Sequence, residues 1–97
     1  MVEITLVVIT HNEEANIYRC LNSAKDIADE ILVIDSNSTD NTKDICEDLG
    51  ANFITKDWEG YSGSKNFGNS LAKGKYILSL DADEVIFIHK GKGVLKT

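Results

Sequence analysis

The sequence predicts an α/β domain: an open, mainly parallel, Rossmann-like sheet with helices on both faces, which makes three layers. Four short apolar segments rich in β-branched residues alternate with segments of helical periodicity. Residues 6–9 and 31–34 are continuously apolar, as expected of strands buried on both faces of a parallel sheet. The chain has 97 residues, 42% of them hydrophobic and 27% charged, and this size fits one domain.

The strands are expected at 4–9, 31–34, 52–55 and 76–80, with a helical segment between each pair. Right-handed crossovers and the common doubly wound order place the first strand beside the fourth. Open sheets of this kind bind their ligands outside the carboxyl ends of the strands, where the strand order reverses. The loops after the first, second and fourth strands should therefore border one crevice.

Three helices are expected: at about 12–25, after 36–38 as far as Gly50, and at about 64–73 before Gly74. Asn and Ser are good N-cap residues, and Gly commonly follows the last helical turn. The residues expected to face the sheet are Ile17, Cys20, Leu21, Ala24, Ile45, Cys46, Leu49, Phe67 and Leu71. Residues 56–63, which include Trp58 and Tyr61, are expected to form a loop.

The end of the chain differs in character from what precedes it. Residues 85–97 are first apolar and then basic and glycine-spaced, which favours a final edge strand and a frayed tail. We expect a domain at 1–88 and a basic tail at 89–97. The start of the chain lacks a basic region followed by an apolar run long enough for a signal peptide or a membrane span. We therefore expect a cytoplasmic protein, with Cys20 and Cys46 as reduced core residues.

The charge balance restricts the class of partner. Ten Lys and Arg against 16 Asp and Glu give a formal net charge of -6, which leaves no basic surface to attract nucleic acid. An acidic protein can still bind an anionic small molecule where helix amino-ends, a few cations or a divalent metal neutralise it locally. Nucleic acid is therefore not an expected partner, whereas a phosphorylated small molecule is allowed.

Polar residues follow the strands that should border the crevice. They are Thr10, His11, Asn12 and Glu13 after the first strand, Asp35 and Ser36 after the second, and Asp81, Ala82 and Asp83 after the fourth. Oxygen ligands such as Asp81 and Asp83 suit Mg²⁺ or Mn²⁺, which keeps several waters and takes other ligands from substrate phosphates. The pattern predicts a metal and diphosphate site. The alternative is that these carboxylates only form a solvated turn.

Three of the polar residues allow two interpretations each. Lys65 could provide a cation for a phosphate, or it could be a solvated surface lysine. His11 could stack on a base or hydrogen bond to it, or be an ordinary loop residue. Asp35 could bind a ribose or base donor group, or cap the following helix.

Other classes of site are disfavoured. Residues 60–65 suggest a phosphate-binding loop, but they lack the Walker spacing, and no Gly-x-Gly-x-x-Gly follows the first strand. A P-loop or NAD-binding site is therefore excluded. The two histidines have no plausible nucleophile at a known elbow, which argues against Ser-His-Asp or Cys-His hydrolase chemistry.

Taken together, four segments resemble the amino-terminal nucleotide-binding half of family 2 glycosyltransferases of the GT-A fold. They are ITHNEE at 9–14, VIDSNSTDNT at 33–42, KNFG at 65–68 and LDADE at 80–84. Within that family, the chain is most similar to the bacterial lipopolysaccharide-core glucosyltransferases. The resemblance covers residues 3 to about 85.

The resemblance implies an inverting hexosyltransferase that takes a sugar from a nucleoside diphosphate donor, commonly a UDP-sugar, and passes it to a glycan or lipid-linked acceptor. Thr10, His11 and Glu13 would match the base-binding loop, and Lys65 the basic residue beside the diphosphate. Asp83 would be the principal metal ligand, while Asp81 would contact ribose or a metal-bound water. The metal would act as a Lewis acid on the departing diphosphate.

Two departures from the family pattern limit what the resemblance implies. Ser36 stands where many members have the second Asp of an Asp-Asp pair. The acceptor-binding half, which carries the general base, would lie beyond Thr97, so no catalytic base is expected in this chain. The chain is then either a piece of a longer enzyme or a stand-alone remnant, and activity of these residues alone is in question.

Alternatives from other classes stay open to different degrees. A nonenzymatic nucleotide-binding or interaction module is the second hypothesis. A sugar-nucleotide pyrophosphorylase should have a Gly-rich basic loop after its first strand, and a receiver-like domain needs a fifth strand followed by Lys. We also expect self-association, with residues 85–88 pairing at a sheet edge. Lipid-linked acceptors of such enzymes suggest peripheral contact with the inner face of the cell membrane.

Overall fold

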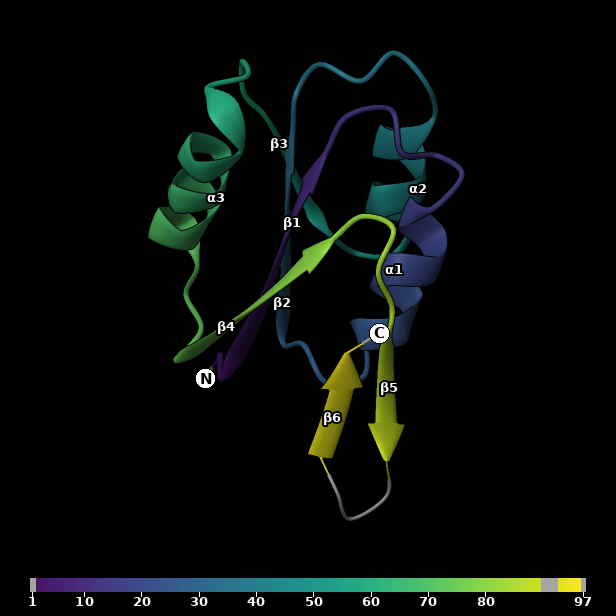
Figure 1. The fold of residues 1–97 in the computed structure, drawn as a ribbon, viewed down its shortest axis with the longest axis vertical. Helices are drawn as coiled ribbons and strands as arrows, with labels where there is room; N and C mark the ends of the chain where they lie inside the picture. The colour runs from purple at the N-terminus through teal and green to yellow at the C-terminus, as the bar shows by residue number, and fades with distance from the viewer. Residues whose placement is uncertain (1, 90–92, 97) are drawn as a thin grey trace.

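The computed structural model describes residues 2–89 and 93–96. Four parallel strands form the main sheet: β1 (Ile4–Thr10), β2 (Glu30–Asp35), β3 (Asn52–Thr55) and β4 (Tyr76–Asp81). Helices α1 (Ile17–Ala24) and α2 (Thr42–Asp48) cover one face of this sheet, and α3 (Gly60–Leu71) covers the other (Figure 1). These three layers confirm the predicted α/β architecture.

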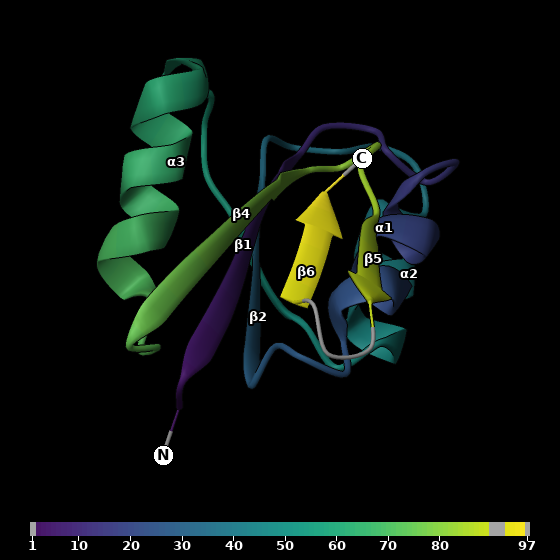
Figure 2. The same ribbon diagram turned by 60° about the horizontal axis from the view of Figure 1, so that its bottom comes forward.

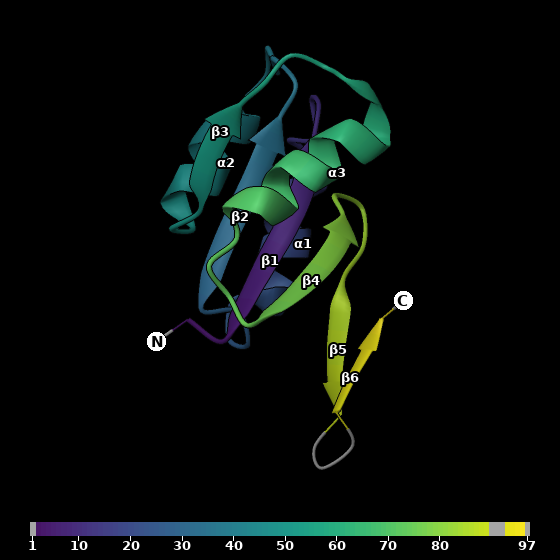
Figure 3. The same ribbon diagram turned by 90° about the vertical axis from the view of Figure 1, so that its left-hand side faces the viewer.

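The strands are arranged in the order β3-β2-β1-β4, so the first strand lies beside the fourth as predicted. In the β1 pairings, Thr10 is opposite Asp35 and Ile9 is opposite Asp81. The carboxyl ends of the three strands therefore finish at nearly the same level. Figure 3 shows this parallel arrangement, with α3 in front of the sheet and α1 and α2 behind it.

The core lies mainly between the sheet and α1. All four residues expected to face inward on α1 are buried: Ile17, Cys20, Leu21 and Ala24. They pack with Leu6, Val8 and Val33 of the sheet in one apolar cluster. Burying each large aliphatic side chain of this kind stabilises the fold by roughly 1.5–3 kcal/mol. Cys46 of α2 joins the cluster, with Ile45 and Leu49 packed against it.

The packing of α3 differs from the prediction. Leu71 is 40% exposed and Phe67 is only partly buried. The buried residues of α3 are small ones, Ser64 and Gly68. A Cβ at Gly68 would lie 2.7 Å from Cγ1 of Val7, so glycine allows the helix to approach the sheet closely. Helix α3 therefore contacts the sheet most closely through Gly68 and not through Phe67 or Leu71.

The helices begin at other residues than expected. Helix α3 starts at Gly60, which has a φ of 86°, so Tyr61 lies in its first turn and not in a loop. Helix α1 starts only at Ile17, because Asn12 has a left-handed φ of 52°. Gly50, with a φ of 81°, follows the end of α2 as predicted.

The last two described strands form a small sheet apart from the main one. Strands β5 (Ile86–His89) and β6 (Gly93–Lys96) pair antiparallel in a two-stranded sheet of their own. The expected edge strand therefore does not extend the main sheet, and 93–96 is a strand and not a frayed tail. The backbone N–H of Ile86 donates to Oγ of Ser23 at 3.0 Å, which anchors β5 beside α1 (Figure 2).

Two expectations about the chain can be compared directly with the structure. Cys20 and Cys46 are both free and buried, as predicted. Among the described residues, no helix is long and apolar enough to cross a membrane.

Candidate functional site

Two adjoining cavities open at the carboxyl edge of the sheet, and together we call them the crevice. The first, of about 360 Å³, is lined by His11, Ser36, Asn37 and Trp58, and we call it the aromatic end. The second, of about 400 Å³, is the acidic end, lined by Ile9, Thr10, His11, Glu13, Asn16, Trp58, Tyr61, Asp81, Ala82 and Asp83. His11 and Trp58 line both cavities, so one elongated ligand can occupy the two ends.

At the aromatic end, His11 is held by the loop that follows β2. Its Nδ1 lies 2.5 Å from the backbone oxygen of Ser36. Because a carbonyl oxygen only accepts, Nδ1 carries the hydrogen of this bond, and Nε2 makes no hydrogen bond with the described residues. Oγ of Ser36 is buried without a hydrogen-bond partner in the described part of the chain, and the Trp58 side chain is 57% exposed. The cavity thus offers flat aromatic surfaces and two unused polar atoms.

Asp35 stands behind this surface and does not line either cavity. It is 2% exposed, and Oδ1 accepts from the Thr10 hydroxyl at 2.5 Å. The backbone N–H of Ser38 donates to Oδ2 at 2.8 Å, and its hydroxyl donates to Oδ1. These bonds hold the turn after β2 and tie it to the end of β1, but they do not cap α2, whose N-cap residue is Asn41, so the helix-capping interpretation of Asp35 is wrong.

Asn12 also connects the loops instead of lining the crevice. Its Oδ1 accepts from the backbone N–H of Thr39 at 2.7 Å, and its own N–H donates to Oγ of Ser38. The N–H of the next residue, Glu13, donates to Oγ1 of Thr42 at 2.9 Å. The loops after β1 and β2 therefore form one hydrogen-bonded unit that positions His11 and Glu13.

At the acidic end, the turn after β4 is closed by two bonds between Asp81 and Glu84. The N–H of Asp81 donates to Oε1 of Glu84 at 2.7 Å, and the N–H of Glu84 donates to the carbonyl oxygen of Asp81 at 2.9 Å. Asp83 projects from this turn, is exposed, and makes no hydrogen bond or ion pair with any residue that the structure describes. Its carboxylate is therefore open to a ligand.

Tyr61 reaches the acidic end from the first turn of α3. Its hydroxyl donates to Oδ1 of Asp81 at 2.6 Å. This hydrogen bond, together with partial burial and the negative charge of Asp81, raises the pKa of Tyr61 to about 12. Lys65 lies one helical turn further on, with Nζ 5.4 Å from the centre of the Tyr61 ring, and it does not line either cavity.

The structure thus gathers most of the predicted site residues. Six of the ten line the acidic end: Thr10, His11, Glu13, Asp81, Ala82 and Asp83. Ser36 lines the aromatic end, which His11 also borders. Within 2–89 and 93–96, no group of three or more His, Cys, Asp or Glu is arranged to hold a metal ion.

Five lining residues were not among the predicted site residues: Ile9, Asn16, Asn37, Trp58 and Tyr61. Trp58 is the only tryptophan of the chain and follows the third strand, so a signal for it was present in the sequence. The loop that carries Trp58 begins at the carboxyl end of β3, at the same edge of the sheet as the three loops that were expected to border the crevice. An exposed aromatic residue at that edge is a candidate for ligand contact.

Comparisons with known proteins show the family of this chain. The model of glycosyl transferase family 2 matches residues 5–95. An uncharacterized glycosyltransferase of Rickettsia bellii is 50% identical over 82 residues, which are 84% of this chain and 28% of the relative. One of Rickettsia felis is 51% identical over 84 residues, 87% of this chain and 30% of the relative. The chain thus spans less than a third of the length of these relatives.

Solved structures show the same fold. TarS of S. aureus, residues 1–349 in complex with UDP, aligns with a TM-score of 0.70 and 30% identity over 87% of this chain and 28% of that one. Glucosyl-3-phosphoglycerate synthase of Mycobacterium tuberculosis, in complex with Mn²⁺, UDP and glucosyl-3-phosphoglycerate, aligns with a TM-score of 0.75 over 87% of this chain and 34% of that one. At 24% identity, the second likeness shows the fold alone. From its match over residues 5–95 and its GT-A fold, the chain belongs to glycosyl transferase family 2.

Proposed function

We propose that these residues bind the nucleoside diphosphate sugar donor, a UDP-sugar, of an inverting glycosyltransferase. The observation that carries this proposal is the joined crevice, which has aromatic surfaces at one end and carboxylates at the other. A nucleotide sugar has a flat base at one end and, beyond the ribose, a diphosphate that a divalent cation can bridge to carboxylates. TarS, at 30% identity, was solved with UDP, which supports this assignment.

The base is proposed to bind at the aromatic end. Trp58 and His11 provide flat surfaces, and stacking of a base on an aromatic side chain contributes about 1–3 kcal/mol. Nε2 of His11 and the unpartnered hydroxyl of Ser36 can satisfy polar atoms of a uracil ring. Asp35, Asn12 and Thr10 keep the supporting loops in place.

The diphosphate is proposed to bind at the acidic end together with Mg²⁺ or Mn²⁺. Asp83 and Asp81 offer only oxygen donors, which these metals prefer, and two carboxylates leave coordination positions for phosphate oxygens and water. The residues therefore fit a metal that is shared with the donor. When bound, such a metal stabilises the negative charge of the leaving diphosphate. Lys65 is proposed as a further cation close to this charge.

The wider role of the chain is also a proposal. We place residues 1–88 as the donor-binding domain and 89–97 as a tail. The acceptor is proposed to be a glycan or a lipid-linked sugar. The general base and the residues that bind the acceptor are proposed to lie outside this chain. The motif resemblance supports a role in lipopolysaccharide biosynthesis in the cytoplasm, at the inner face of the cell membrane. A nonenzymatic nucleotide-binding module is the alternative if UDP binds and no sugar is transferred.

A titration of Trp58 fluorescence tests the donor assignment. Because Trp58 is the only tryptophan and lines both cavities, its emission should change on addition of UDP or UDP-glucose, and binding should tighten with Mn²⁺. In the Asp83→Ala variant, the gain in UDP affinity that Mn²⁺ produces should be at least about 10-fold smaller than in the wild type. Calorimetry gives an independent value.

Asp26→Ala is the matched control. Asp26 is equally an exposed aspartate, but it lies just beyond α1 and outside the crevice. This variant should bind UDP and Mn²⁺ like the wild type. If the wild type does not bind UDP with or without Mn²⁺, the proposed function is wrong. If Asp83→Ala and Asp26→Ala behave alike, the assignment of the metal to Asp83 is wrong.

A further inference from the structure

One hydrogen bond at the acidic end of the crevice links helix α3 to the sheet. Tyr61 belongs to the first turn of α3, and Asp81 ends β4. The phenol of Tyr61 donates to Oδ1 of Asp81 at 2.6 Å, and both residues line the acidic end. Figure 3 shows the beginning of α3 and the end of β4 on the same side of the molecule. Tyr61 is thus a neighbour of the proposed metal ligands from a different element.

The two carboxylates differ in how they are held. Asp81 is fixed at its backbone by Glu84 and at its side chain by Tyr61, whereas Asp83 makes no described hydrogen bond or ion pair. With one lone pair of Oδ1 taken by the phenol, Oδ2 is the more open oxygen of Asp81 for a ligand. Tyr61 therefore determines the orientation in which Asp81 faces the cavity that it shares with Asp83.

The other side of the Tyr61 ring is also in contact. Nζ of Lys65 lies 5.4 Å from the ring centre, within the range of a cation–π contact. Tyr61 and Lys65 are four residues apart on α3, so they share one helix face. The ring of Tyr61 is thereby held between the ammonium of Lys65 and the carboxylate of Asp81.

We propose that Tyr61 is a positioning residue of the metal corner: its phenol orients Asp81 so that Asp81 and Asp83 together accept a divalent cation with the donor diphosphate. This inference rests on the proposed function and adds a residue and a role to it. Groups that hydrogen bond to metal ligands generally contribute about 10–100-fold to metal affinity. Tyr61 acts through Asp81 and not by contact with the reacting atoms.

The test is the ratio of UDP affinities with and without Mn²⁺, measured by calorimetry. In Tyr61→Phe, which keeps the ring beneath Lys65, this ratio should fall by about 10-fold. Tyr76→Phe is the matched control, because Tyr76 is also an exposed tyrosine beneath a lysine, Lys75, but it lies at the start of β4. In Tyr76→Phe the ratio should equal that of the wild type.

A second arm asks whether Tyr61 works through Asp81. In an Asp81→Ala background, adding Tyr61→Phe should cause no further loss of the ratio, because the partner of the phenol is gone. An unchanged or higher ratio in the single variant Tyr61→Phe overturns the inference, as does a further loss in the Asp81→Ala background. Both results leave the proposed function intact, which fails only if the wild type binds no UDP.

Discussion

The two thiols illustrate how strongly the core controls the chemistry of a single residue. Burial, followed by the charges of Glu84 and Asp83, raises the pKa of Cys20 from 9.0 to about 12. Burial and the charge of Asp35 raise the pKa of Cys46 to about 12 in the same way. Both thiols therefore remain protonated at neutral pH and have no nucleophilic role in the folded chain.

These shifts predict that alkaline pH destabilises the fold. Between pH 9 and 12 the unfolded thiol is ionised and the folded thiol is not, so the unfolded state binds fewer protons and the free energy of unfolding falls as pH rises. Each thiol contributes a decrease of up to about 1.4 kcal/mol per pH unit in this window. Urea unfolding at pH 8 and pH 11, followed by Trp58 fluorescence, measures the effect.

The double variant Cys20→Ala/Cys46→Ala isolates the thiols in this experiment. Between the two pH values its free energy of unfolding should fall by less than that of the wild type, because both thiols are absent. It should still fall to some extent, because other groups, such as Tyr61, remain. The same decrease in both proteins would show that the thiols do not cause the alkaline effect.

At the scale of single residues, the sequence predicted a residue's place best where that place depends on its neighbours in the chain. Asp81 and Asp83 could be placed at the crevice because they directly follow a β-branched, apolar strand. The bonds of Asp35 to Thr10, and of Asn12 to Thr39, join residues 25 or more positions apart and leave no local signal. The contact between Tyr61 and Asp81 also spans 20 positions in the sequence. Such contacts become visible only when the loops are placed in space.

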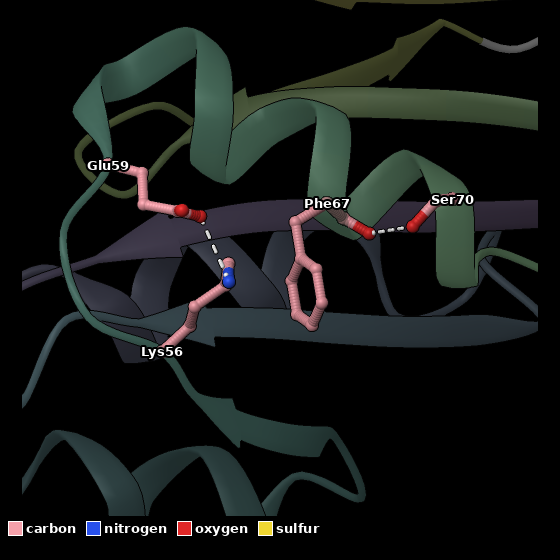
Figure 4. Close-up of polar contacts among 4 residues, drawn as sticks. All are labelled: Lys56, Glu59, Phe67 and Ser70. Atoms are coloured by element: carbon pink, nitrogen blue, oxygen red, sulfur yellow. Dashed lines mark hydrogen bonds and ion pairs between the residues drawn. The ribbon is translucent and has the colours of Figure 1, made fainter.

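At the element scale, the segment between β3 and α3 decides where Trp58 lies. Lys56 forms an ion pair with Glu59 at 2.9 Å and stands 4.5 Å above the centre of the Phe67 ring. Figure 4 shows Lys56 between these two side chains, with the hydroxyl of Ser70 donating to the carbonyl oxygen of Phe67. Lys56 thus attaches the loop that carries Trp58 to the body of α3.

We predict that Lys56→Ala weakens UDP binding more than it weakens the fold. An ion pair at the surface contributes about 0–1 kcal/mol, so the melting temperature should fall by only a few degrees. Without the ion pair and the contact with the Phe67 ring, the loop that carries Trp58 should become more mobile. Ordering this loop when UDP binds then costs free energy, which should lower the affinity for UDP by roughly 3–10-fold. Calorimetry measures the affinity, and the anisotropy of Trp58 emission in the free protein should decrease.

Lys75→Ala is the control for this prediction. Lys75 also stands above an aromatic ring, that of Tyr76, but it lies at the start of β4 and away from the crevice. If Lys56→Ala and Lys75→Ala bind UDP with the same affinity, Lys56 does not hold the loop for the ligand.

The strands were easier to predict than the helix starts, for a physical reason. Continuous apolar runs such as 31–34 need burial on both faces, which only a central parallel strand provides. The start of α1 depends instead on Asn12, whose left-handed backbone is held by distant Ser38 and Thr39. The early start of α3 depends on Gly60 with a positive φ and on the loop before it. Tertiary contacts therefore decided these boundaries.

At the scale of the whole molecule, right-handed crossovers and the common doubly wound order predicted that the first strand lies beside the fourth. The order β3-β2-β1-β4 confirms this neighbour relation. The pairing of β5 with β6 was not predicted, because two short strands that pair with each other have the same apolar pattern as an edge strand. This order leaves β3 and β4 at the two edges of the main sheet in the described part of the chain.

The last prediction, self-association, belongs to this scale. Tyr76 and Ile77 on β4 are 59% and 44% exposed, and an edge strand presents unpaired backbone groups to other chains. The sequence had suggested 85–88 as the contact, but β5 pairs with β6, which leaves β4 as the more open edge. Sedimentation velocity of this chain over a rising concentration series should show a shift from monomer to dimer.

Ile77→Lys should displace this shift to higher concentration, because a charge on an edge strand opposes pairing with a second copy. Arg19→Lys, an exposed substitution on α1 that keeps the charge, should sediment like the wild type. A wild-type protein that remains monomeric throughout the series would rule out self-association. Equal dimerisation of Ile77→Lys and the wild type would instead move the contact away from β4 and back to 85–88, the segment that the sequence suggested.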